Sequence, residues 1–326
     1  MRPLMGRYIV RRVIWVVVTL LLITFLTYVI FFVMPPTDPA VNFAGKQPTP
    51  ELVAEVKEQF GLDKPLLVQY GLFVERLVTG DEWGWPGLGF SFNTRGALKP
   101  IIAKRLLVTL QLAAGAAVIW LISGLALGVL SALRPRSIFD RVSMGFALLG
   151  VSAPVFFVGP VLLYLFWFKL RWLPGTGFYP ISQYGLGEWF LHMLMPWTVL
   201  ALAFAAVYAR LSRANLIEVM SEDYIRTARA KGLPRSRVVL RHGLRASLTP
   251  IVTVFGLDLG SLLGGAIITE TVFNLQGIGN YAVSSVFDGD LYAILDVTVI
   301  AAFFVVFANL VVDVLYAFLD PRVRYS

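Results

Sequence analysis

The sequence predicts an all-α polytopic membrane protein with six transmembrane helices and with both termini in the cytoplasm. The chain of 326 residues is 57% hydrophobic and only 15% charged, and its mean hydropathy is +0.74. A soluble chain of this length carries more charge. Apolar runs long enough to cross a bilayer recur along the chain. The basic residues gather at the ends of these runs and in one loop, where they orient the spans.

The first predicted span follows a basic N-terminus. Four arginines precede an apolar run over residues 13–34, and a helix of that length measures about 33 Å. A cleaved signal peptide is the alternative, but its apolar core is shorter and ends in small residues. Pro35-Pro36 follows this run instead, so we expect an uncleaved first span.

Residues 35–100 form a polar segment that we expect on the external side of the membrane. Their six basic and eight acidic residues have no positive bias, as an exported segment permits. Within this segment, Thr49-Pro50 predicts the start of an amphipathic helix and Gly61 predicts its end.

Five further runs predict spans two to six, over residues 106–133, 142–168, 189–209, 247–269 and 291–319. Pro154 and Gly159-Pro160 should kink the third span. Small residues at four-residue spacing let a neighbouring helix approach closely. They occur in the second span at Gly124 and Gly128, and in the fifth at Gly256, Gly260 and Gly264.

The longest strongly polar stretch after residue 100 lies between the fourth and fifth spans. We call residues 218–250 the basic segment. From Arg210 to Arg245 the chain carries nine Lys or Arg residues against three acids, so this loop is expected to face the cytoplasm. Gly232 is predicted to cap the end of a short helix, and Pro234 to start a second helix.

The start of the first helix is also marked in the sequence. Ser221 is predicted to be its N-cap, with Glu222 and Asp223 in the first turn, where negative charge is favourable. Glu222 stands four residues before Arg226, an order that favours an ion pair. The basic segment is therefore predicted to hold a compact charged helix between two spans.

The amino-acid sequence of the basic segment resembles that of a known family. YIRTARAKG at residues 224–232 and LRHGLRASLTP at residues 240–250 are similar to the cytoplasmic EAA loop of ATP-binding-cassette (ABC) import permeases. The sequence is most similar to the dipeptide/oligopeptide branch of this family. Two positions depart from the family pattern. Arg226-Thr227-Ala228 stands in place of Glu-Ala-Ala, and Arg241-His242 falls near a common proline.

The resemblance covers nearly the whole chain. Residues 60–81 are similar to the external segment of these permeases, and residues 267–322 to their external turn and closing NLxxDxxYxxxDPR pattern. The resemblance implies the type I ABC importer permease fold in a first-permease subunit. It places a helix and the external segment in residues 1–101, the permease domain in residues 102–319 and a cytoplasmic tail in residues 320–326.

In this family the loop is a coupling helix that sits in a cleft of an ATPase subunit. The motif match implies this role for Glu222, Asp223, Tyr224, Arg226, Ala228, Lys231 and Gly232. A basic, solvated loop without a partner is the alternative. The implied partners are a second homologous permease in a heterodimer, two ATP-binding subunits, an extracytoplasmic substrate-binding protein, a di- or oligopeptide substrate and lipid. The external segment is expected either to meet the binding protein or to cover the mouth of the pathway.

The sequence contains no recognisable set of catalytic residues. It has no GxxxxGK[ST] loop for ATP phosphates, no cysteine, and only two histidines, which are far apart. We therefore expect no enzyme activity, no cofactor and no metal in this chain, with ATP and Mg bound by partner subunits. Basic residues at span ends fit lipid headgroups better than nucleic acid.

Acidic residues at membrane depth are costly and usually face a cavity or a partner. Asp258 is expected either to line the translocation path, where it meets a peptide ammonium group, or to make a polar contact between helices. Glu270, at the outer end of the fifth span, is expected to face the mouth or to bind the delivering protein. Asp296 and Asp313 fall in the sixth span, and Asp313 is expected to be structural.

Other functions remain open at this point. Nickel or glutathione could replace peptide, because selectivity in this family rests largely with the binding protein. A secondary transporter would have inverted repeats and coupling-ion residues near the midplane. A membrane enzyme would need clustered acid–base or metal groups. Neither pattern is evident in the sequence.

Overall fold

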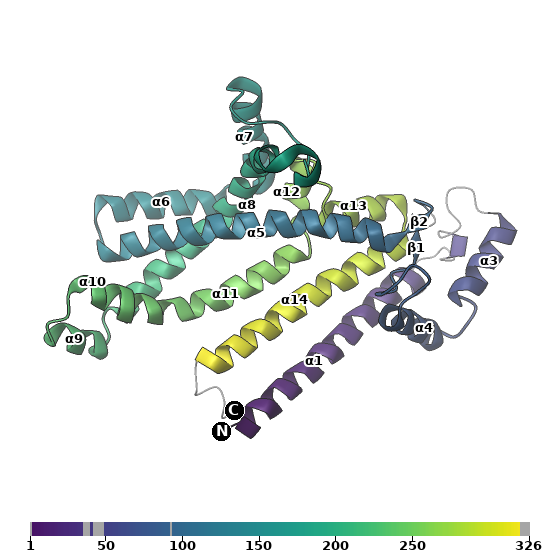
Figure 1. Ribbon diagram of the computed structural model, residues 1–326, viewed down its shortest axis with the longest axis horizontal. Helices are drawn as coiled ribbons and strands as arrows, with labels where there is room; N and C mark the ends of the chain where they lie inside the picture. The colour runs from purple at the N-terminus through teal and green to yellow at the C-terminus, as the bar shows by residue number, and fades with distance from the viewer. Residues whose placement is uncertain (1, 35–39, 42–48, 92, 320–326) are drawn as a thin grey trace. The chain divides into compact units, whose positions relative to one another are not determined.

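The computed structural model describes residues 2–34, 40–41, 49–91 and 93–319 and is mostly helical (Figure 1). The chain forms two compact units. Unit 1 comprises Met1–Thr109, Gly260–Ile267 and Gln276–Leu310. Unit 2 comprises Leu110–Leu259, Ile268–Leu275 and Val311–Ser326.

Five stretches of helix among the described residues are long and apolar enough to cross a membrane. They are Ile9–Val33, Leu98–Leu133, Ile181–Val219, Arg235–Leu263 and Leu291–Val314. They coincide with the predicted first, second, fourth and sixth spans and with most of the fifth. The first combines α1 (Arg2–Tyr28) with a short π-helix, η1 (Val29–Val33), and the second is α5 (Leu98–Leu133).

The predicted third span is a sharply bent pair of helices. α6 (Ile138–Ser152) meets the helix formed by α7 (Val155–Leu162) and the π-helical η2 (Leu163–Lys169) at 103°. The break falls at Pro154, as predicted, because a proline disfavours helical backbone in the residue before it. At the second predicted kink, Gly159-Pro160, the helix continues as α7 and leads into η2. Counted as one span, this pair completes the six predicted.

The fourth span belongs to a helix that is longer than the predicted run. α8 extends over Ile181–Val219 and is interrupted at Gly185, whose φ of +82° favours glycine. The helix continues past residue 209, so Arg210 and Arg213 lie within α8 and not beyond its end. The apolar run therefore locates the span but underestimates the helix.

The predicted external segment packs against α1 in unit 1. α3 (Pro50–Phe60) starts at Thr49 and ends at Gly61, as predicted. α4 (Leu66–Thr79) is tied to α1 by side-chain hydrogen bonds. The Tyr70 hydroxyl donates to the Leu21 carbonyl at 2.8 Å, and the Tyr28 hydroxyl donates to Gln69 Oε1 at 3.1 Å.

A short hairpin, which the sequence did not predict, precedes α5. Its strands are β1 (Phe90–Ser91) and β2 (Gly96–Ala97), paired antiparallel. The buried Ser91 hydroxyl donates a hydrogen bond to the carboxylate of Asp290. Asp290 also accepts the Ala293 N–H at 3.3 Å, so it caps the start of α14 (Leu291–Leu319). The hairpin is thereby attached to α14 within unit 1.

The fifth span ends earlier than predicted. α11 (Arg245–Leu263) stops at Leu263, and α12 (Ile267–Val272) and α13 (Ile278–Asp288) then lead to α14. Gly265 has φ +120°, and a β-carbon there would lie 2.6 Å from Gly279 Cα. Position 265 therefore favours glycine for two reasons, its left-handed backbone and the lack of space for a β-carbon. The helix ends before this residue because its φ is not helical.

Candidate functional site

The basic segment folds as a helix, a turn and a second helix in unit 2, as predicted. α9 (Asp223–Ala230) follows α8, and α10 (Arg235–Arg237) continues through the π-helical η3 (Val238–Leu244) into α11 (Figure 1). The predicted N-cap is wrong by one position. Glu222 has the extended backbone of the cap, while the Ser221 hydroxyl donates to the Glu218 carbonyl at 2.6 Å.

Gly232 ends α9, as predicted. Its φ is +76°, and its N–H donates to the Arg229 carbonyl at 2.9 Å. The Leu233 N–H donates to the Ala228 carbonyl at 3.4 Å, which completes a Schellman motif. A β-carbon at Gly232 would meet nothing within 4 Å, so the backbone conformation and not space favours glycine. Pro234 then forms the N-cap of α10.

A small apolar core holds α9 against the second half of the basic segment. Ile225, Ala228 and Val238 are buried, and Met220 and Leu233 pack against them. Ala228 therefore serves the internal packing of the segment, where a small side chain lets α9 lie close to η3. The basic segment is a packed structure rather than an extended loop.

The other side of α9 is exposed and charged. Its exposed motif residues include Glu222, Asp223, Tyr224, Arg226 and Lys231. Arg226 pairs with Asp223 at 3.2 Å, whereas the sequence predicted a pair with Glu222. Because both side chains are largely solvated, this ion pair contributes little stability. Partial burial and the nearby Glu222 carboxylate raise the pKa of Tyr224 above its ordinary value.

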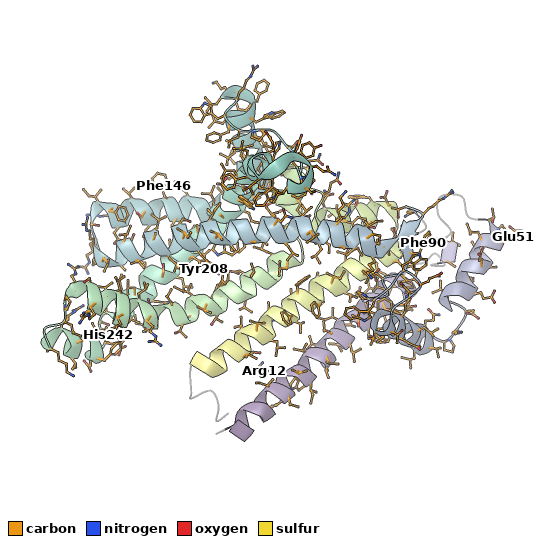
Figure 2. The ribbon with its side chains drawn as sticks, viewed as in Figure 1. Arg12, Glu51, Phe90, Phe146, Tyr208 and His242 are labelled. Carbon is orange, nitrogen blue, oxygen red and sulfur yellow. The ribbon has the colours of Figure 1, made fainter. Side chains whose placement is uncertain are left out.

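The second half of the basic segment contacts α8 and α5. A β-carbon at Gly243 would lie 2.8 Å from Met220 Sδ, so η3 lies close to the end of α8. The Arg235 guanidinium donates to the Leu133 carbonyl, the last residue of α5, at 3.3 Å. His242, which is labelled in Figure 2, is half-buried in η3.

A partly buried ion pair, which the sequence did not predict, joins α6 to α8. Arg213 donates through Nε and Nη2 to the two carboxylate oxygens of Asp140, at 2.6 and 2.8 Å. Asp140 is 3% exposed and also accepts the Arg136 N–H at 2.8 Å. One signal was available, because Ser137 and Asp140 have the spacing of a capping box.

Asp258 makes a polar contact between helices, one of the two roles predicted for it. The Tyr208 hydroxyl on α8 donates to Asp258 Oδ2 on α11 at 2.8 Å. Tyr208, labelled in Figure 2, is fully buried, whereas Asp258 is half-buried. Trp120 packs beside Tyr208 and Phe255, with ring centroids 6.2 and 6.0 Å away. The sequence predicted no particular role for Tyr208 or Trp120, because both lie within apolar spans.

The other acids near the membrane have different surroundings. Glu270, in α12, is fully buried within unit 2. Its side chain lies inside the chain in this conformation. Asp296 is fully buried in unit 1, and Asp313 is half-buried. Asp320, in the closing sequence pattern, lies outside the described residues.

The glycines at four-residue spacing lie against neighbouring helices. A β-carbon at Gly124 would lie 2.7 Å from Tyr208 Cβ, and one at Gly128 would overlap Ser212 Oγ. Gly256 and Gly260 on α11, and Gly264 just after its end, lie against Val312, Ala308 and Ala301 of α14, respectively. Side chains at these positions would force the backbones apart.

These features define a class of protein. Long apolar helices alternate with short polar connections, and one connection is a folded, exposed and charged helix. Within the described part of the chain, no group of three or more His, Asp or Glu residues could hold a metal ion. The fold and the site are those of a multi-pass membrane protein with a folded, charged connection between two spans.

Comparison with known proteins identifies the family. Residues 124–325 match the family described as "Binding-protein-dependent transport system inner membrane component", and residues 5–113 match the N-terminal region of such components. The chain belongs to this family. It is a multi-pass permease subunit of the bacterial inner membrane and is not an enzyme by itself.

Curated relatives match over their full length. A protein of Sinorhizobium fredii named as a "Probable peptide ABC transporter permease protein" is 35% identical over 98% of this chain and 100% of its own length. The "Glutathione transport system permease protein" of Escherichia coli is 38% identical over 99% of this chain and 100% of its own length. A crystal structure titled as "an amino acid ABC transporter with histidines" has a TM-score of 0.50 at 17% identity. It covers 69% of this chain and 95% of that one, and it supports the fold.

Proposed function

We propose that this chain is one transmembrane subunit of an ABC importer that carries di- or oligopeptides across the cytoplasmic membrane. Separate ATP-binding subunits hydrolyse ATP, and an external binding protein delivers the cargo. The observation that carries this proposal is α9. Its own apolar core fixes it from inside, and its charged side remains exposed on an otherwise apolar chain. A transporter driven by an ion gradient has no need of such a helix.

The proposed role of α9 is to dock on an ATP-binding subunit. Its contact surface consists of Glu222, Asp223, Tyr224, Arg226 and Lys231, while Ala228 and Gly232 hold its shape. ATP draws the two ATP-binding subunits together, and α9 moves with the subunit that it contacts. The outward-open arrangement is favoured only to the extent that ATP binds that arrangement more tightly. ATP and Mg bind to the partners, and this chain carries no cofactor.

The proposed topology has both termini and the basic segment in the cytoplasm, because basic residues gather there. The proposed regions of the chain are a first helix with the external segment in residues 1–101, the permease domain in residues 102–319 and a cytoplasmic tail in residues 320–326. The external segment is held on α1 and α14 within unit 1 by Tyr70 and Ser91. This attachment supports a fixed cover over the mouth, whose exposed side remains available to the binding protein.

The substrate class rests on the relatives. A peptide is favoured because a relative matching over full length carries that name. Glutathione, itself a small peptide, is the second candidate, because the relative from Escherichia coli is named for it. Neither of these two names points to nickel.

The proposed pathway lies between this chain and a homologous second permease, so each supplies half of it. Asp258 is the proposed polar element of this half, because its carboxylate is half-buried and only Oδ2 receives the Tyr208 hydroxyl. Its negative charge suits the ammonium group of a peptide. Glu270 is a weaker member of the path, since it is fully buried in the present conformation.

Purification of the intact complex tests the proposal. This chain, tagged and extracted in mild detergent, should bring with it a second permease and two ATP-binding subunits. The complex in liposomes should then take up labelled peptide when ATP and the binding protein are supplied. Purification without ATP-binding companions, or solute uptake by the chain alone along an ion gradient, would refute the proposed function.

A further inference from the structure

Asp140 lies where three parts of unit 2 meet: α6, α8 and the turn between α5 and α6. Its two carboxylate oxygens receive Nε and Nη2 of Arg213, at 2.6 and 2.8 Å. Its backbone N–H donates to the Ser137 hydroxyl oxygen at 3.1 Å, so it also belongs to the cap of α6. One side chain therefore connects the start of α6 with a helix that lies 73 residues further along the chain.

Asp140 also holds the turn between α5 and α6 in an unfavourable conformation. Arg136 in this turn has φ +65°, a region that residues with side chains rarely adopt. The Arg136 N–H donates to Asp140 Oδ2 at 2.8 Å, and the Arg141 guanidinium donates to the Arg136 carbonyl at 3.2 Å. The turn is thereby fixed in one shape.

α9 is linked to the residues around this turn on both of its sides. Arg213 precedes it on α8, which continues as helix to Val219 and leads directly to α9. Arg235 follows α9 and donates to the carbonyl of Leu133, the residue just before the turn. A displacement of α9 therefore pulls on the α5–α6 turn at two points.

The contact between α5 and α8 limits how these helices can slide. Ser212, the neighbour of Arg213, is 1% exposed and packs so closely on Gly128 that a β-carbon there would overlap its hydroxyl. Packed interfaces of this kind shift between discrete arrangements rather than deforming continuously. Movement at one end of α8 is consequently passed on rather than absorbed.

The Asp140–Arg213 pair is poorly explained as a source of stability alone. Burying the Asp140 carboxylate is costly, and the partial exposure of Arg213 weakens the attraction that offsets this cost. What a bidentate pair of arginine and carboxylate does supply is a fixed relative orientation of the two helices. A defined geometry matters here because α8 carries α9.

We infer that Asp140 is a positioning residue for energy coupling: through Arg213 it makes the α5–α6 turn and α6 move together with α8 and α9. This inference rests on the proposed function, in which a partner moves α9. Without the pair, ATP-driven movement of α9 still occurs but is passed less completely to α5 and α6. The complex then hydrolyses ATP without a full transport step.

The test is the number of ATP molecules hydrolysed per peptide transported by the reconstituted complex. Asp140→Asn keeps the size of the side chain and removes its charge. Arg213→Gln removes the partner but leaves Asp140 bonded to the Arg136 N–H. We expect each variant to raise the ATP-to-peptide ratio at least about fivefold, and the double variant to raise it no further. Arg213→Lys, which keeps the positive charge, should give an ATP-to-peptide ratio between those of Arg213→Gln and the wild type. The matched control is Arg210→Gln, an exposed arginine one turn earlier on α8, which should leave the ratio unchanged.

A merely structural role gives a different result. It would lower the yield of complex, and would lower ATP hydrolysis and transport in parallel, with the ratio unchanged. An unchanged ratio in Arg213→Gln overturns the inference even if Asp140→Asn fails to assemble. The proposed function itself fails separately, if the wild-type complex contains no ATP-binding subunits or takes up no peptide.

Discussion

Tyr208 on α8 donates a 2.8 Å hydrogen bond to Asp258 on α11. The tyrosine is fully buried and the aspartate is half-buried, so this pair is a polar contact between helices with one carboxylate oxygen still unused by Tyr208. A carboxylate at this depth needs such a donor, because the hydrocarbon region offers none. The geometry permits both of the predicted roles of Asp258, and two variants separate them.

Asp258→Asn should impair peptide uptake while leaving assembly intact. The amide oxygen still accepts the Tyr208 hydroxyl, but the charge that would attract an ammonium group is gone. Hydrogen bonds to charged groups contribute about 1.5–3 kcal/mol, so kcat/KM for uptake should fall about tenfold or more. Tyr208→Phe is the comparison, since it removes the contact and keeps the charge. If both variants transport at the wild-type rate and differ only in thermal stability, Asp258 is a packing residue.

Replacement of Gly232 should weaken coupling through the backbone. A side chain has free space there, but a residue other than glycine costs about 1–2 kcal/mol at a left-handed φ. Gly232→Val should therefore distort the end of α9 and reduce both recovery of the ATP-binding subunits and uptake. Gly232→Asn should be nearly normal, because asparagine tolerates this conformation. Equal behaviour of the two variants in a pull-down assay would mean that the φ of Gly232 is not what matters.

Gly128→Ala should destabilise the contact between α5 and α8. The new methyl group would overlap Ser212 Oγ and lie 2.5 Å or so from the Ala209 carbonyl, in van der Waals conflict with both. Overpacking of this kind costs about 1–3 kcal/mol, so the unfolding temperature in detergent should fall. Gly145→Ala on α6 is the matched control, because a β-carbon there meets nothing within 4 Å. Alanine also favours helix over glycine, so the control should be neutral or slightly stabilised. A fall of similar size in both variants would argue against close packing as the cause.

The spans were predictable because the bilayer imposes their length and composition. Residues 291–319 were predicted as a span and form α14, since a long and mostly apolar run in lipid must satisfy its backbone as helix. The ends of other spans were harder. α8 extends beyond its apolar run because polar residues continue a helix equally well outside lipid, and α11 stops at Leu263 because Gly265 lies against Gly279. The latter is a tertiary contact that no local pattern reveals.

The basic segment was predictable for a similar reason, and its internal partners were not. Gly232 ends one helix and Pro234 starts the next, so the helix–turn–helix could be predicted from local sequence alone. The choice of Asp223 over Glu222 as the partner of Arg226 depends on where the helix starts, and the predicted start was one residue early. Asp140 and Arg213 stand far apart in sequence, so only the fold reveals that they meet.

Asp290 makes the stability of the external part of unit 1 depend on pH. It lies outside the membrane-spanning stretch, and burial raises its pKa, although hydrogen bonds from Ser91 and Ala293 act in the opposite direction. A carboxyl group with a raised pKa keeps its proton in the folded state at pH values where the unfolded chain has lost it. The free energy of unfolding therefore falls as pH rises from the ordinary value of about 3.9 to the raised value, and this loss is complete above the raised value.

Asp290→Asn should remove this part of the pH dependence. The amide does not ionise, and its oxygen still accepts a hydrogen bond from the Ser91 hydroxyl. As pH rises from about 4 to about 7, the unfolding temperature of the variant should therefore fall less than that of the wild type. The measurement is the difference in unfolding temperature between variant and wild type across that range. Asp63→Asn, at an exposed acid in the same external segment, should follow the wild type. If the Asp290→Asn difference stays constant with pH, then Asp290 ionises alike in the folded and unfolded chains. Its buried bond to Ser91 would then hold the hairpin without any linkage to protons.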